Sequence, residues 1–215
     1  MIVWLLLIVL LLAAVALLLR QRRRQLRRGD DSSALAAGGA GRTLFNLRQG
    51  DIVQFDGRDW VVEDRLLYDD QGFQWLEYLL RDGADRRWLS VVEDDWLELS
   101  WLEAAPAALT AGLPELAPWM PEQIAWDGVT YGRRETGNAS FTASSRRMNR
   151  SQGSCRYGDY RAEGGRVLSI EVWGGGDTPA NMKARETAEV EVTIGRIIDP
   201  ALVTILPGDG RSVYR

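Results

Sequence analysis

Two ten-residue stretches of the chain match without a gap: Asp51-Ile52-Val53-Gln54-Phe55-Asp56-Gly57-Arg58-Asp59-Trp60 and Glu122-Gln123-Ile124-Ala125-Trp126-Asp127-Gly128-Val129-Thr130-Tyr131. Both share the pattern acid, aliphatic, aromatic, Asp-Gly and a second aromatic at the same spacing. Asp-Gly between strand-like residues is a strong hairpin signal, because a type I′ turn needs positive φ at both of its central residues. Each stretch is therefore predicted to form a β-hairpin.

Two further matches follow in the same order along the chain. Trp75-Leu76-Glu77-Tyr78 is similar to Tyr157-Gly158-Asp159-Tyr160, and Leu89-Ser90-Val91 is similar to Leu168-Ser169-Ile170. Three ordered matches indicate an internal duplication, with chance similarity between hairpins as the alternative. The halves would span about 44–103 and 122–206, joined by the Pro-rich segment 104–121. Because either half alone would leave an apolar face and sheet edges uncovered, we expect one mainly-β domain over 44–215, barrel- or sandwich-like, with two similar halves.

The same motifs resemble a bacterial family called domain of unknown function 4178. The resemblance covers about 44–206 and is carried by Gly50-Asp51-x-Val53, Asp56-Gly57-x-x-Trp60, Trp75-x-Glu77-Tyr78-x-Leu80, Trp88-Leu89, Tyr157-x-Asp159-Tyr160, Leu168-Ser169-Ile170-Glu171 and the stretch 189–195. The family name records no established activity, so the resemblance supplies no catalytic residues.

The first twenty residues are predicted to be a membrane anchor. Ile2 to Leu19 carries no charge, and as a helix it would be about 27 Å long, near the roughly 30 Å hydrocarbon core of a bilayer. The alternative is a cleaved signal peptide, for which Ala14-Val15-Ala16 has the small-x-small pattern of a cleavage site. A signal peptide, however, carries its positive charge before the apolar run, and here the charge follows it.

A basic juxtamembrane segment and flexible linker are predicted over 21–43. The arginines next to the apolar run are Arg20, Arg22, Arg23, Arg24, Arg27 and Arg28. The positive-inside rule then gives a single-pass protein of the cell membrane, with the N-terminus outside and the C-terminal domain in the cytoplasm. The same arginines are expected to contact anionic lipid head groups, so the bilayer is an expected partner.

Composition removes several classes of function. The chain has no histidine and a single cysteine, Cys155, which excludes Ser-His-Asp and Cys-His catalysis, Cys/His zinc sites and an intramolecular disulfide. Residues 1–42 hold seven arginines and two acids, so 43–215 hold 19 basic and 28 acidic residues. A domain that acidic is a poor partner for nucleic acid. We expect no metal and no cofactor.

Four residues are candidates for ligand binding: Trp75, Glu77, Tyr157 and Asp159. Strand alternation places Trp75 and Glu77 on one face, and Tyr157 and Asp159 repeat this arrangement on the matched strand. A carboxylate beside an aromatic face can hold a cationic ligand. In the alternative, the aromatic rings are core and the acids bond to the backbone or to arginines such as Arg86 and Arg87.

Two hypotheses for function follow from these features. The first is a non-enzymatic binding or assembly module held at the membrane, with another membrane or cytoplasmic protein as partner. The second is a receptor or enzyme for a small cationic ligand at the aromatic-acid motifs. An enclosed acidic pocket lined by both motifs would favour the second, and a filled core would favour the first.

Overall fold

The computed structural model describes residues 41–111, 120–145, 151–173 and 189–208. The predicted anchor at 1–20 and nearly all of the predicted linker at 21–43 lie outside these ranges. None of the helices within them has the length and apolar character needed to cross a membrane. The described residues from Arg42 onward belong to one compact unit.

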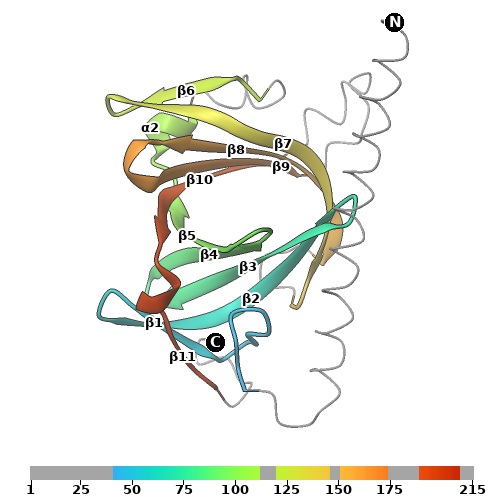
Figure 1. Ribbon diagram of the computed structural model, residues 1–215, viewed down its shortest axis with the longest axis vertical. Coiled ribbons are helices and arrows are strands. Elements are labelled where there is room, and N and C mark those ends of the chain that lie inside the picture. Colours follow the sequence, from blue (N-terminus) through green and yellow to red (C-terminus); the bar gives the residue numbers. More distant parts are fainter. Residues whose placement is uncertain (1–40, 112–119, 146–150, 174–188, 209–215) are drawn as a thin grey trace, which may run out of the picture. The chain divides into compact units, whose positions relative to one another are not determined.

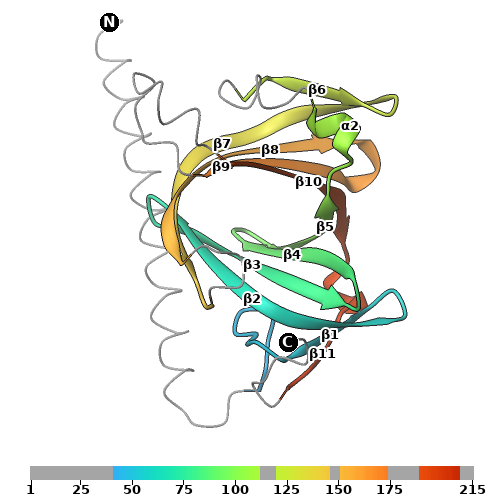
Figure 2. The same ribbon diagram turned by 180° about the vertical axis from the view of Figure 1, so that it is seen from behind.

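This unit is built almost entirely from strands (Figures 1 and 2). The strands are β1 (Ile52–Phe55), β2 (Arg58–Asp70), β3 (Phe73–Asp82), β4 (Asp85–Glu93), β5 (Leu97–Ala104), β6 (Gln123–Trp126), β7 (Val129–Ala143), β8 (Gln152–Ala162), β9 (Arg166–Trp173), β10 (Glu189–Ile198) and β11 (Thr204–Leu206). The short helix α2 (Ala107–Thr110) and the 3₁₀ turns η1 (Glu163–Gly165) and η2 (Pro200–Leu202) complete the described elements.

Eight of these strands close into a ring. The order is β2-β3-β4-β5-β10-β9-β8-β7, and β7 pairs back onto β2. Every pairing is antiparallel. The remaining strands extend the sheet beyond the ring, with β1 and β11 beside β2 and with β6 beside β7. Mainly-β structure, as the sequence predicted, is confirmed.

Strands β1–β5, the first half, are paired like strands β6–β10, the second half. Val53 lies opposite Trp60 in β1–β2, as Ile124 lies opposite Tyr131 in β6–β7. Tyr78 lies opposite Leu89 in β3–β4, as Tyr160 lies opposite Leu168 in β8–β9. The long strands also bulge at corresponding places, between Val62 and Asp64 in β2 and between Arg133 and Glu135 in β7. The residues matched in the sequence therefore occupy matching register positions.

The two predicted Asp-Gly hairpins are confirmed. Asp56 and Gly57 have φ of 53° and 72°, and Asp127 and Gly128 have φ of 50° and 71°. Positive φ at both central residues is the signature of a type I′ turn. The hairpins β1–β2 and β6–β7 project outside the ring at its two sides (Figure 1).

Other strand boundaries differ from those expected. β7 runs to Ala143, well beyond the stretch ending at Tyr131 for which the sequence predicted a hairpin, although residues 132–143 show no apolar alternation. Its pairing with β8 and β2 supplies the order that the local sequence does not. Trp96 is 72 % exposed in the turn before β5. The last long strand is described from Glu189 to Ile198, so it extends past the family stretch 189–195.

Hydrophobic side chains form three clusters because each strand alternates its faces. Two clusters lie on the outer faces of the ring, where each half packs under its own hairpin. Tyr78 and Trp60 belong to the cluster of the first half, and Tyr160 and Tyr131 belong to that of the second half. The third cluster comprises Leu66, Tyr68, Trp75, Ala139, Phe141, Cys155, Tyr157 and Trp173 and joins the two halves. Its members lie on the opposite strand faces, so they face the interior of the ring together with polar residues and a few other apolar side chains such as Leu102 and Val167.

Candidate functional site

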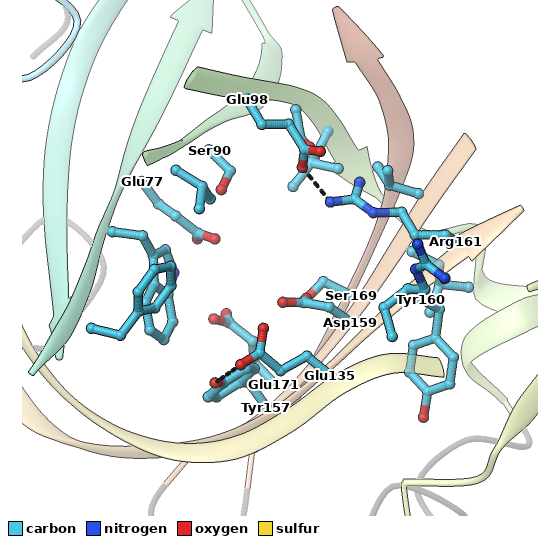
Figure 3. Close-up of a pocket in the computed structure, with 18 residues that line it drawn as sticks. Glu77, Ser90, Glu98, Glu135, Tyr157, Asp159, Tyr160, Arg161, Ser169 and Glu171 are labelled. Carbon is cyan, nitrogen blue, oxygen red and sulfur yellow. Dashed lines mark hydrogen bonds and ion pairs between the residues drawn. The ribbon is translucent and has the colours of Figure 1, made fainter. Parts of the chain in front are cut away.

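A cavity of about 140 Å³ lies within the ring (Figure 3). Its lining comes from both halves, from β3, β4 and β5 on one side and from β7, β8 and β9 on the other. All four residues predicted for ligand binding line it: Trp75, Glu77, Tyr157 and Asp159. The structure therefore brings together the two aromatic-acid motifs, which are more than seventy residues apart in the sequence.

The described lining is strongly acidic. It includes five carboxylates, which are those of Glu77, Glu98, Glu135, Asp159 and Glu171, against the two guanidinium groups of Arg134 and Arg161. Arg161, on β8, forms an ion pair with Glu98, on β5, across the ring interior. Arg134 is exposed. Carboxylates without a matching cation therefore dominate the interior.

A fully buried tyrosine bonds to two of these acids. The Tyr68 hydroxyl donates to Oε1 of Glu171 at 2.8 Å and lies 3.4 Å from Oε2 of Glu77. A hydroxyl has one proton and can donate it to only one carboxylate at a time. Glu191 lies directly opposite Glu171 in the β9–β10 register, so like charges also face each other across the two strands, an unfavourable arrangement if both ionise.

Burial and mutual repulsion keep these acids protonated to higher pH. Burial, followed by the charges of Asp159 and Glu191, raises the pKa of Glu77 to about 8. Burial, followed by Glu77 and Glu191, raises the pKa of Glu171 well above its ordinary value. Burial also raises the pKa of Asp159, although its hydrogen bond from Ser169 opposes the shift. The cluster therefore retains protons near neutral pH.

Aromatic rings form one wall of the cavity. Trp75 stacks on Tyr68, with ring centroids 4.7 Å apart and planes 2° apart, and it meets Tyr157 edge-on with centroids 5.1 Å apart. The Tyr157 hydroxyl donates to Oδ2 of Asp70 at 3.0 Å. Because these rings pack on one another and are hydrogen-bonded, the wall is held in a fixed geometry.

Serine hydroxyls face the acids in both halves. Glu77 lies opposite Ser90, and Asp159 lies opposite Ser169, whose hydroxyl donates to Asp159 Oδ1 at 2.8 Å. Ser90 also lies opposite Ser100 in β4–β5. Both are only 8 % exposed and line the cavity, and Ser90 points into it.

The hydroxyls of Ser90 and Ser100 make no hydrogen bond to any group in the described part of the chain. Buried polar groups are normally hydrogen-bonded, so two such hydroxyls beside one cavity call for a partner within it. Water or a ligand with donor groups can fill that role.

Comparison with known proteins places the domain in a family. Residues 48–200 match the family model described as Domain of unknown function (DUF4178). The chain belongs to this family. An uncharacterised protein of Mycobacterium bovis and one of Mycobacterium tuberculosis are each 33 % identical over 134 residues, covering 59 % of this chain and 61 % of theirs. An uncharacterised protein of Aquifex aeolicus is 27 % identical over 156 residues, covering 69 % of this chain and 82 % of its own. No solved structure matches.

In this DUF4178 domain, the acidic residues have partners other than the backbone groups and arginines that the alternative interpretation of the sequence named. Glu77 and Asp159 contact the hydroxyls of Tyr68 and Ser169, whereas Arg87 pairs with Glu103 on an outer face. The aromatic rings of Trp75 and Tyr157 are buried, as that alternative expected, but they also line the cavity. Core packing and cavity lining thus coexist in the same side chains.

Several lining residues were missed as site residues. Ser169 and Glu171 belong to a motif already quoted for the family, and their alternation with Leu168 and Ile170 could have placed them on the inner face. Glu98, on β5, and Glu135, on β7, gave no such signal, because only ring closure brings their strands to the cavity.

The remaining predicted site residues cannot be placed. The membrane-surface arginines at 20–28 lie outside the described residues. Within the described ranges, no three acids or cysteines are arranged as ligands of a metal ion. Cys155 is 1 % exposed and packs in the third cluster.

Proposed function

We propose that this domain is a membrane-anchored binding module for a small organic cation, which it holds without chemical conversion inside the ring. One observation carries the proposal: both aromatic-acid motifs line a single acidic cavity that also contains unpartnered serine hydroxyls. This is the arrangement that favours a ligand-binding protein over an assembly module with a filled core.

The size and walls of the cavity define the ligand. A volume of about 140 Å³ is close to that of the roughly 150 Å³ engineered cavity that binds benzene, so the ligand has about five to seven non-hydrogen atoms. A positive charge would be attracted both by the carboxylates and by any aromatic face that the wall formed by Trp75 and Tyr157 presents to the cavity. An anion would be repelled by the same carboxylates.

The overall design supports the same proposal. We interpret the ring as a small barrel that arose by duplication, in which each half contributes one aromatic-acid motif to a shared interior. Matched registers in the two halves support this history. The anchor at 1–20, with its arginines on the cytoplasmic side, would hold the barrel in the cytoplasm near the bilayer and concentrate binding at the membrane.

Thermal unfolding of the full-length chain tests the proposal. Millimolar n-butylammonium or tetramethylammonium chloride should raise the unfolding temperature above that in sodium chloride of equal ionic strength, because a ligand that binds only the folded state stabilises it. The double variant Glu77→Gln/Asp159→Asn should unfold cooperatively but lose this increase. Glu93→Gln removes an exposed acid at the end of β4 and should keep it.

Two results would contradict the proposal. One is an equal response of the double variant and the wild-type chain, since binding would then lie elsewhere. The other is the absence of stabilisation by either cation, which would return the domain to the assembly-module hypothesis.

A further inference from the structure

The acids of the cavity are too close together to ionise all at once. Glu77 reaches in from β3 and Glu171 from β9, and the Tyr68 hydroxyl from β2 contacts both. Glu191, on β10, lies opposite Glu171. Its neighbour Val192 packs in the outer cluster of the second half, so alternation turns Glu191 towards the ring interior. Two carboxyls therefore share one donor hydroxyl, and a third faces one of them across the β9–β10 pair.

The other charged and titratable groups nearby do not neutralise them. On β8, Arg161 forms an ion pair with Glu98 of β5. Asp159 and the hydroxyl of Tyr157, also on β8, add further acidic groups. On β7, Glu135 offsets Arg134, and both are exposed. Cys155 is the remaining titratable neighbour of Tyr68. Neutrality at the centre thus depends on a proton held by the carboxyl groups or on a cation from outside.

We propose that the cavity exchanges a proton for a primary ammonium ion, with Glu77 and Glu171 as the groups that release the proton. This inference rests on the proposed function and names its ligand class. One carboxyl of the pair gives its proton to solvent, the ligand R–NH₃⁺ takes its place, and the net charge of the cavity stays constant. Exchange avoids both costly states, namely several bare carboxylates together and an added cation beside neutral acids.

A primary ammonium fits the hydrogen-bonding groups better than a quaternary one does. It has three N–H donors, and the cavity offers three acceptors: the hydroxyls of Ser90 and Ser100, and the Glu77 carboxyl, which shares the single Tyr68 proton with Glu171. A quaternary ammonium has no donor and would leave those groups unpaired, which costs affinity. It also prefers to be surrounded by aromatic faces, whereas one face of Trp75 is already covered by Tyr68.

Titration calorimetry of the full-length chain with n-butylammonium chloride tests the exchange. Measurement at pH 7 in phosphate and in Tris gives the number of protons released, because the two buffers differ in ionisation enthalpy. About one proton should leave for each amine bound, and affinity should rise about tenfold per pH unit between pH 6 and 7.5. The amine itself remains charged there, since an alkylammonium titrates near pH 10 like lysine.

Variants and a second probe complete the test. Glu77→Gln should reduce proton release and flatten the pH dependence, whereas Glu93→Gln should leave both unchanged. Tetramethylammonium chloride should bind at least tenfold more weakly than n-butylammonium. The wild-type comparison between buffers needs no variant, so it stands even if Glu77→Gln folds poorly.

The outcomes separate the two proposals. Butylammonium binding with no proton release, or tighter binding of tetramethylammonium, would overturn the exchange while leaving a cation-binding site in place. Binding of neither cation would overturn the proposed function together with this inference.

Discussion

Tyr68 shows how a single side chain organises the interior. Its ring stacks on Trp75 and its hydroxyl serves Glu171 and Glu77, so the position of the acids is tied to the packing of the aromatic wall. Burying several carboxyls in this way opposes folding unless protons or a cation compensate. Such a cost is common at functional sites, where perturbed pKa values gather, and it supports a binding role for the cavity.

The stability of the chain should therefore fall with rising pH through Glu77. Its pKa is raised from 4.5 to about 8 in the folded state, so between these values the folded chain holds a proton that the unfolded chain has lost. The linkage relation then lowers the free energy of unfolding as pH rises, by up to about 1.4 kcal/mol per pH unit, and the decline ends above the folded pKa.

Replacement of Glu77 by Gln should remove this decline. Chemical denaturation from pH 5 to pH 9 is expected to show the variant gaining stability relative to wild type as pH rises, because Gln mimics the protonated acid and never ionises. Glu93→Gln changes an exposed residue, so its free energy of unfolding should follow the same pH dependence as that of the wild type. A constant difference between Glu77→Gln and wild type over this range would show that Glu77 ionises as freely in the folded chain as in the unfolded one.

At the scale of elements, local sequence predicted those features that local chemistry determines. The Asp-Gly turns needed only two residues each, and the strands that hold Trp75 and Tyr157 showed clear alternation. The end of β7 was not predicted because Gly132, Gly137 and Asn138 disfavour strands and residues 132–143 show no apolar alternation. Its order comes from pairing with β8, the next strand, and with β2, which is remote in sequence.

The two hairpin turns should respond alike to substitution. Gly57→Ala and Gly128→Ala place a Cβ at φ of 72° and 71°, so each should lower the free energy of unfolding by about 1 kcal/mol even though the space around both is open. Gly132→Ala, in β7, is the matched control. It has open space and no positive φ, and it should be neutral or slightly stabilising. A large loss at only one of the two turns would argue against equivalent hairpins.

At the scale of the molecule, the cavity exists because two halves close on each other. The β5–β10 and β2–β7 pairings join the two halves. The backbones of β5 and β10 lie close together, because a Cβ on Gly195 would lie 1.9 Å from the Trp101 carbonyl oxygen. The pairing of Glu98 with Arg161 spans the same closure. Sequence could identify the two motifs and their similarity, but which strands meet across the ring depends on long-range pairing that no local pattern encodes.

We propose that the orientation of the whole molecule is set by the positive charge that follows the apolar run at 2–19. If the arginines stay inside, the linker and the β domain would be cytoplasmic. We expect a cysteine introduced at Ser33 to react with a membrane-impermeant maleimide only after cells are permeabilised. The wild-type chain is the matched control, because its Cys155 is buried and should remain unlabelled in the folded protein.

Membrane attachment must be shown in the same cells, since an unanchored cytoplasmic chain would be shielded too. The protein should sediment with membranes and resist extraction by alkaline carbonate, as a spanning helix does. Labelling at Ser33→Cys in intact cells would reverse the orientation or indicate a cleaved leader, and release by carbonate would remove the anchor. Cytoplasmic placement also bears on exchange, because the cavity would then meet its cation at a pH near 7, where the raised pKa of Glu77 makes a proton available for release.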